Sequence, residues 1–438
     1  MSEEGRQIPY LFLSAPSQAS SNVTKLRVYI QAPIHGDEPA ADQAVMALVG
    51  KMDANETWTS SLLEKMDIKI LPRYNVDGVH YFQRQLASNY DPNRDLNKFD
   101  RQQTKDIRRE FISFNPHLCM DLHEFRGPAV YGGEWQHGND GLIYASYNLN
   151  IHENIRSAQD DIFIPVMDEY LSSHGLRWGP YVVGSTSDEP GTKIQFSEVL
   201  SEAKYAHFGF GMTQALSFLF EMRGISLANQ HFQRRTATAL LKMEATLDTA
   251  RDRAEEVYAL VESAREEFIQ SDSDVVITEH TTPEERPFTM VHTQNGSVID
   301  VLVDYNHSNP AIANLTRSRP EAYLIPRTWV DIVELLKLQG LEVQTLEHEF
   351  YGTVESLNIT SSELAGELYE GRVLNTVTTE ANYKEVSLPA GSFLISTRQQ
   401  NAALAFASLE PENVDSFVSW GIIPMQVAWE YPVFRVME

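Results

Sequence analysis

The chain has 438 residues and a formal net charge of −26 at pH 7. Its length allows a sizeable buried core and two domains. The acidic balance argues against nucleic-acid binding, which needs clustered Lys and Arg. No run reaches the roughly 18 apolar residues of a membrane span. The one cysteine, Cys119, excludes an intrachain disulfide and a Cys-rich metal site.

The sequence favours a secreted or extracellular protein over a cytoplasmic one. It contains six Asn-x-Ser/Thr sequons, a mild excess over chance, at Asn22, Asn55, Asn295, Asn306, Asn314 and Asn358. The opening Met1-Ser2-Glu3-Glu4-Gly5 lacks the apolar run of a signal peptide, so we expect a mature chain whose leader is removed.

The first part of the chain alternates strand-like and helix-like segments, which predicts an α/β sheet. Predicted strands are Leu26–Gln31, Asp67–Leu71, His117–Leu122 and Ser217–Met222. Predicted helices are Ala40–Met52, Thr104–Phe114 and Asn154–Gly175. Between about residues 229 and 270, helical periodicity with i,i+4 charge pairs predicts a solvated outer helix pair.

The composition then changes at Ser271-Asp272-Ser273-Asp274, which we interpret as a linker. Mostly short β-rich segments follow, with one helix predicted at Thr328–Gln339 and ended by Gly340. The predicted architecture is therefore a mixed-sheet α/β domain over residues 1–275 and a smaller β-rich domain over residues 276–438.

Candidate metal ligands lie at the ends of two predicted strands. His35 and Glu38, three residues apart, lie where the first strand leads into a helix. His123 comes directly after the third strand, at the edge where open α/β sheets place their sites. Two histidines and one carboxylate, with a fourth position left for water, form the recurrent ligand set of hydrolytic zinc. A lone histidine after a strand is usually structural, so the prediction depends on neighbouring segments.

Those segments are Arg73-Tyr74-Asn75-Val76-Asp77-Gly78, then Arg84, then Tyr90-Asp91-Pro92-Asn93-Arg94-Asp95. With them the sequence resembles the M14 family of zinc carboxypeptidases. The matching segments, in order across residues 26–224, are His35-Gly36-Asp37-Glu38, Asn75-Val76-Asp77-Gly78, Asp91-Pro92-Asn93-Arg94, His123 and Phe220-Glu221-Met222-Arg223.

The resemblance implies that His35, Glu38 and His123 hold one Zn²⁺ per chain. It also implies that Asp91 accepts the outer N–H of His35, which orients the ring. Glu221 corresponds to the catalytic carboxylate of the family, the general base and acid. Its apolar strand should desolvate it and raise its pKa, which suits a base.

Recognition of a free C-terminal carboxylate needs a bidentate Arg and a neutral donor. Asn93 and Arg94 are the first candidates, and Asn97 with Lys98 are the second, although Lys lacks the planar fork of Arg.

Peptide hydrolysis also needs an activated water and stabilisation of the tetrahedral oxyanion. Zinc lowers the pKa of its water to about 7 and polarises the carbonyl. Arg84 is the first candidate to face the oxyanion, and Arg73 is its rival.

Two regions match the family less well. The mobile tyrosine of better-known members has no secure counterpart, and Tyr205 is the nearest candidate. The end of the chain resembles an extension of certain microbial M14 proteins, over Arg319–Pro326 and Leu409–Ser416, with no chemistry to assign.

The sequence thus predicts a zinc carboxypeptidase that hydrolyses the C-terminal peptide bond, with the zinc-bound water as nucleophile and peptide or protein C-termini as substrate. A zinc amidase or deacylase acting on N-acyl amino acids or other small amides is the alternative. A binding protein on an inactive hydrolase scaffold is a third, which the intact ligand set disfavours.

Overall fold

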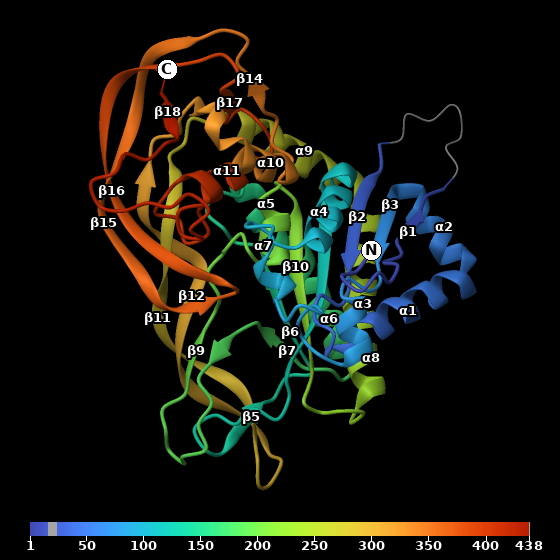
Figure 1. The fold of residues 1–438 in the computed structure, drawn as a ribbon. Coiled ribbons are helices and arrows are strands. Elements are labelled where there is room, and N and C mark those ends of the chain that lie inside the picture. The colour runs from blue at the N-terminus through green and yellow to red at the C-terminus, as the bar shows by residue number, and fades with distance from the viewer. Residues whose placement is uncertain (16–23, 438) are drawn as a thin grey trace.

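The computed structural model describes residues 1–15 and 24–437 (Figure 1), so the sequon at Asn22 lies outside the described residues. A seven-stranded mixed sheet forms its centre, in the order β1-β3-β2-β4-β10-β6-β7. Neighbours among β3, β2, β4 and β10 are parallel, and β1 and β6 pair antiparallel at the two sides. The strands are β1 (Leu11–Leu13), β2 (Leu26–Gln31), β3 (Met66–Leu71), β4 (Leu118–Arg126), β6 (Gly141–Ala145), β7 (Trp178–Pro180) and β10 (Leu216–Ile225).

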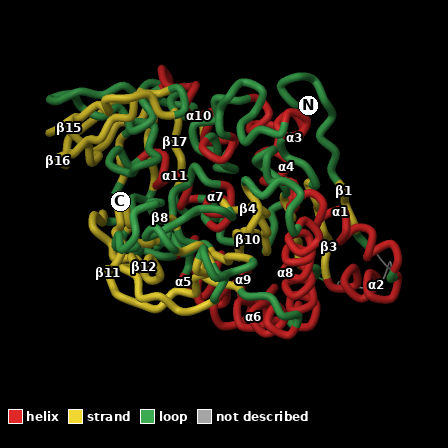
Figure 2. The backbone as a smooth tube through the Cα atoms, turned by 90° about the horizontal axis from the view of Figure 1, so that it is seen from below, coloured by secondary structure: helices red, strands yellow, loops and turns green. Residues whose placement is uncertain are grey.

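Helices cover both faces of this sheet because both faces are apolar. Val28 and Ile30 of β2 lie in the larger core, and Tyr29 between them lies in a second core. Figure 2 shows α6 and α8 on one side of β4 and β10, and α4 and α7 on the other. The helices of this part are α1 (Pro39–Ala54), α2 (Glu56–Lys65), α3 (Val76–Tyr81), α4 (Gln102–Phe114), α5 (Glu153–Ala158), α6 (Ile164–Ser173), α7 (Ala206–Gly211), α8 (Phe232–Asp252) and α9 (Ala254–Gln270).

The predicted strands and helices of this part are present, and two strands, β4 and β10, are longer than predicted. β4 continues to Arg126, so His123 lies inside the strand and not after it. The reason is its neighbour: β10 pairs with β4 in parallel register as far as Arg126. No helix in the described part of the chain is long and apolar enough to cross a membrane.

The prediction of a solvated helix pair is wrong for α8. Arg235 and Lys242 of this helix are buried. The Lys242 ammonium donates to the backbone oxygens of Leu142 and Glu221, at 2.9 Å each. Each buried cation therefore has partners inside the protein. The charged residues in the sequence predicted a solvated helix because they do not show which of them have buried partners.

The second half of the chain adds two further sheets whose main strands are long, not short as predicted. The five-stranded sheet has the order β5-β11-β12-β9-β8, and β11 and β12 contain 18 and 20 residues. β5 and β9 precede residue 275, so chain from both sides of the predicted boundary builds this sheet, and the boundary itself stays a prediction. The strands are β5 (Trp135–His137), β8 (Val183–Gly184), β9 (Gln195–Ser197), β11 (Val275–His292) and β12 (Val298–Arg317).

The six-stranded sheet has the order β14-β17-β13-β18-β15-β16. Helix α10 (Val330–Leu338) matches the predicted helix, and Gly340 follows it with a φ of 78°. Figure 1 shows the long β15–β16 hairpin curving from this sheet towards α7. The remaining elements are β13 (Ala322–Ile325), β14 (Gln344–Thr345), β15 (Phe350–Tyr369), β16 (Arg372–Leu388), β17 (Phe393–Ser396), α11 (Ala402–Leu409) and β18 (Phe434–Val436).

The buried ion pair between Arg235 of α8 and Glu124 of β4 yields a stability prediction. Nε and Nη2 of Arg235 donate to the two carboxylate oxygens at 2.7 and 2.9 Å. The change Arg235→Met leaves a buried carboxylate without its cation and should lower the free energy of unfolding by about 3 to 5 kcal/mol.

Urea unfolding of Arg234→Met is the matched control. The neighbouring Arg234 pairs with Asp140, but 47% of its side chain is exposed, so its loss should cost at most about 1 kcal/mol. Equal losses in the two variants would contradict a structural role for the buried pair.

Candidate active site

The loop after β2 is held by close contact with the turn after β3. A Cβ on Gly36 would lie 2.0 Å from the carbonyl carbon of Gly78, so this approach requires glycine. The Asn75 side chain caps α3 by accepting from the Gly78 N–H at 2.8 Å, and its amide donates to the Arg84 oxygen at 3.2 Å. The segment Asn75–Gly78 thus supports both the loop that carries His35 and the backbone of Arg84.

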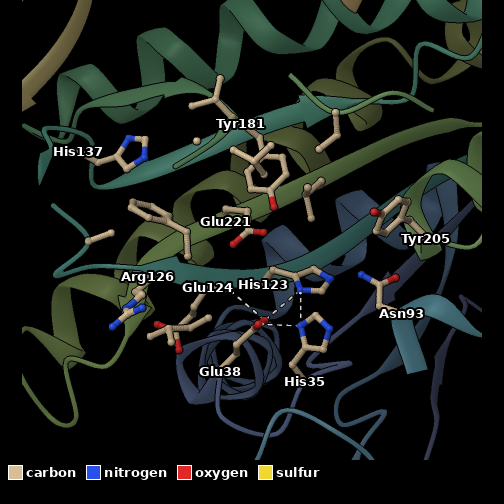
Figure 3. A pocket seen from close by; sticks show the side chains of 18 of the residues that line it. His35, Glu38, Asn93, His123, Glu124, Arg126, His137, Tyr181, Tyr205 and Glu221 are labelled. Atoms are coloured by element: carbon tan, nitrogen blue, oxygen red, sulfur yellow. Dashed lines mark hydrogen bonds and ion pairs between the residues drawn. The ribbon is translucent and has the colours of Figure 1, made fainter. Parts of the chain in front are cut away.

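His35, Glu38 and His123 converge as the sequence predicts (Figure 3). Nδ1 of His35 lies 2.7 Å from Oε1 of Glu38, and Nδ1 of His123 lies 3.0 Å from Oε2. The two Nδ1 atoms are 3.1 Å apart, and one potential ligand atom from each residue lies within 4.8 Å of the others. All three side chains are buried, at most 2% exposed. A buried cluster of two imidazole nitrogens and a carboxylate fits a cation, and this donor set suits zinc best.

Each histidine has an aspartate on its outer nitrogen. Nε2 of His35 lies 3.2 Å from Oδ1 of Asp91, and Nε2 of His123 lies 3.2 Å from Oδ2 of Asp121. An ionised aspartate can only accept a hydrogen bond, so the N–H of each ring is on the outer nitrogen that faces the aspartate. With the N–H held on the outer nitrogen, the inner Nδ1 of each ring is the atom that would offer a lone pair to a metal.

Glu221 lies beside this cluster on the adjacent strand. β10 runs parallel to β4 with Glu221 opposite His123, which brings both side chains to the same face. Its Oε2 is buried and has no hydrogen-bond partner among the described residues. Burial raises the pKa of Glu221 to about 7, so the side chain exchanges protons near neutral pH.

A cavity of about 360 Å³ is lined by the three residues of the cluster and by Glu221, Asn93 and Arg94. In Figure 3, Asn93 and Tyr205 lie on one side of the histidines, and His137 and Arg126 lie on the other. The Asn93 Oδ1 accepts from the N–H of Ala206 at 2.7 Å, which leaves its amide nitrogen to donate. The guanidinium of Arg94 lies over the Tyr205 ring, 4.4 Å from its centroid.

The Arg84 guanidinium borders the cluster directly. Its Nη2 donates to Asp91 at 2.9 Å, and its Nη1 lies 3.1 Å from Nδ1 of His35. Burial lowers the pKa of Arg84, but the carboxylates of Asp91 and Glu38 outweigh burial and raise it. Arg84 is therefore a fixed positive charge at the edge of the cavity.

Comparison with known proteins agrees with this geometry. The family model described as zinc carboxypeptidase matches residues 1–135. Carboxypeptidase 2 of Trichophyton tonsurans and that of Trichophyton rubrum are each 45% identical to this chain, over 99% of the chain and 81% of their own length. The chain belongs to the M14 family of zinc carboxypeptidases.

Among solved structures, a metallo-carboxypeptidase from Burkholderia cenocepacia is 21% identical, with a TM-score of 0.43 over 56% of this chain and 62% of its own. Membership of the family and the relatives at 45% identity make the protein a metallocarboxypeptidase, whose substrates are peptides. Family membership implies zinc, and the His35–Glu38–His123 group has the donors to hold it. The names of the relatives do not favour the amidase alternative.

The second-choice residues of this carboxypeptidase lie away from the cavity. Asn97 and Lys98 are buried, and the Lys98 ammonium pairs with Asp95 at 2.9 Å. Arg73 pairs with Asp42 on α1. None of these three residues lines the cavity, whereas Asn93, Arg94, Arg84 and Tyr205 all do.

Asp121, Tyr181 and His207 are among the residues of the site that were not predicted from sequence. Asp121 has a signal that could have identified it, because a residue two positions before His123 on a strand shares its face. Tyr181 and His207 line the cavity but come from loops and a short helix without a motif. Burial lowers the pKa of His207 to about 3, and neither ring nitrogen has a partner among the described residues. His207 therefore presents a neutral imidazole to the cavity.

The two aspartates yield a prediction about metal affinity. The change Asp91→Asn removes the charged acceptor of the His35 N–H and should weaken zinc binding about 10- to 100-fold. Competition with a chromogenic chelator measures this affinity directly. Asp42→Asn is the control, because this buried carboxylate pairs with Arg73 and contacts neither histidine. Equal zinc affinity in the Asp91 and Asp42 variants would contradict the assigned contact.

Proposed function

We propose that this carboxypeptidase uses one Zn²⁺ per chain, held by His35, Glu38 and His123, to remove the last residue of peptides and proteins. One observation carries the proposal: the buried ligand cluster shares a cavity with Glu221, which lies on a strand, and with Asn93 and Arg94, which lie on a turn. These groups match the three tasks of an exopeptidase, which are metal binding, proton transfer and recognition of a free carboxylate.

Asn93 and Arg94 bind the terminal carboxylate in this proposal. A guanidinium pairs with a carboxylate through two parallel hydrogen bonds, and the free amide nitrogen of Asn93 adds a neutral donor. The resulting charge pair selects a substrate with an ionised C-terminus. A C-terminal amide lacks that charge and leaves the arginine unpaired, so amidated peptides should be poor substrates.

Glu221 moves the proton. Its unpartnered Oε2 accepts a proton from the attacking water and passes it to the leaving amine, for which a pKa of about 7 is well suited. Zinc, when bound, supplies acidification of that water and polarisation of the scissile carbonyl. Arg84, fixed by Asp91, faces the negative charge that develops on the carbonyl oxygen.

The protein acts outside the cell in this proposal. Three sequon residues, Asn55, Asn295 and Asn314, are exposed for glycosylation. Protein from its native host that carries no glycan at any of them would contradict this location.

An activity assay tests the proposal. The wild-type enzyme should release single residues from a peptide with a free C-terminus, lose this activity with a chelator, and cleave the amidated twin far more slowly. Glu221→Gln should lower kcat at least about a hundredfold while one zinc per chain is retained, because the amide cannot accept the proton.

Glu244→Gln is the matched control, since Glu244 is buried on α8 and accepts from the Tyr170 hydroxyl away from the cavity. Its kcat should equal that of the wild type. Undiminished turnover by Glu221→Gln would remove Glu221 from its proposed role, and equal cleavage of the amidated peptide would remove Asn93 and Arg94 from theirs.

A further inference from the structure

The tip of the β15–β16 hairpin contacts the turn that carries Asn93 and Arg94. The Arg94 Nε donates to the Tyr369 hydroxyl at 2.8 Å, across 275 residues of sequence. The backbone N–H of Asp91 donates to the Glu370 carboxylate at 2.9 Å, across 279 residues. The C-terminal sheet, which the sequence left without a role, therefore reaches the active site.

An ion pair anchors the same tip two residues after Glu370. Nε of Arg372 donates to Asp100 at 2.9 Å, and the Asp100 carboxylate also accepts from Lys98. Hydrogen bonds and ion pairs at Tyr369, Glu370 and Arg372, all around one turn, define a docked contact rather than a chance approach of two surfaces.

The tip has a defined shape. Tyr369 pairs with Arg372, so Glu370 and Gly371 form a two-residue turn, with φ values of 49° and 78°. Two left-handed residues are the signature of the hairpin turn that matches strand twist. A Cβ on Gly371 would lie 2.5 Å from the Tyr90 hydroxyl, so only glycine allows the turn to approach this closely.

Tyr369 itself is held by stacking. Its ring lies on the ring of Trp420, with centroids 5.9 Å apart and planes 22° apart, and Trp420 is 1% exposed. The position of the Tyr369 hydroxyl is therefore set by the C-terminal part of the chain before any substrate binds.

These contacts leave one edge of Arg94 free. Nε is occupied by Tyr369, Nη1 donates to the Asn93 oxygen at 2.9 Å, and the Tyr205 ring covers one face. Among the described residues Nη2 has no hydrogen-bond partner, and Nη1 keeps a second N–H besides the one donated to Asn93, so both terminal nitrogens can still donate to a carboxylate in the cavity. An arginine fixed in this way loses less rotamer entropy on binding.

We propose that Tyr369 is a positioning residue that pre-orients Arg94 for the terminal carboxylate of the substrate, and that the β15–β16 hairpin tip holds Tyr369 in this position. This inference rests on the proposed role of Arg94. It gives the C-terminal sheet a part in substrate binding and none in the chemical step. Loss of the Tyr369 hydroxyl should therefore change KM and leave kcat nearly intact.

The test compares Tyr369→Phe with the wild-type zinc enzyme on the free-C-terminus peptide. Loss of one hydroxyl that accepts from a charged group should raise KM about tenfold, with kcat within about twofold. Calorimetric binding of the released amino acid should weaken by a similar factor. Tyr351→Phe is the matched control, because Tyr351 lies on the same strand, is 69% exposed and donates to Glu385.

Thermal unfolding and zinc content should be unchanged in both variants, since each removes a single oxygen atom. An unchanged KM for Tyr369→Phe in an otherwise active enzyme would overturn the inference, as would a loss confined to kcat. A wild-type enzyme that does not distinguish free from amidated peptides would instead contradict the proposed role of Arg94, so the two failures can be told apart.

Discussion

The active site depends on two aspartate–histidine contacts that keep both imidazoles aimed at one point inside the protein. Burial of imidazoles and carboxylates without partners is costly, and here every outer histidine nitrogen faces a carboxylate. The sheet topology brings the residues of the site together, because β2, β4 and β10 are neighbours in this order. His35 follows the first of these strands, while His123 and Glu221 lie in the second and third. Adjacent parallel strands thus bring the proposed metal ligands and the proposed proton carrier to one edge of the sheet.

The proposed substrate anchor has a different origin. Asn93 and Arg94 lie on a short turn outside the sheet, and such a turn has few contacts of its own to hold a long side chain. Helix α7 supports it from one side through the Ala206 N–H, and the β15–β16 hairpin supports it from the other through Tyr369. Asn97, a few residues on, donates to the Asp415 oxygen near the end of the chain. The C-terminal part of the chain thus contacts the peptidase part at the turn that carries Asn93 and Arg94 and a few residues after it.

The sequence predicted what short-range patterns specify. Short apolar runs located β2, β3 and β10, and polar residues at predicted strand ends located His35, Glu38 and His123. Contacts across long sequence separations were beyond such patterns. The pairing of β4 with β10 lengthens β4 past His123, and the inward packing of α8 depends on partners for Arg235 and Lys242 that lie on other strands. Tyr369 has no local motif either, because its role follows only from where the hairpin ends.

The most direct test of this account is anomalous diffraction from crystals of the purified protein, recorded on both sides of the zinc absorption edge. The account predicts one anomalous peak per chain, with Nδ1 of His35 and of His123 at about 2.0 to 2.1 Å and a Glu38 oxygen at about 2.0 to 2.2 Å. A peak bound by other residues, or zinc-loaded protein with no peak between these three side chains, would contradict it.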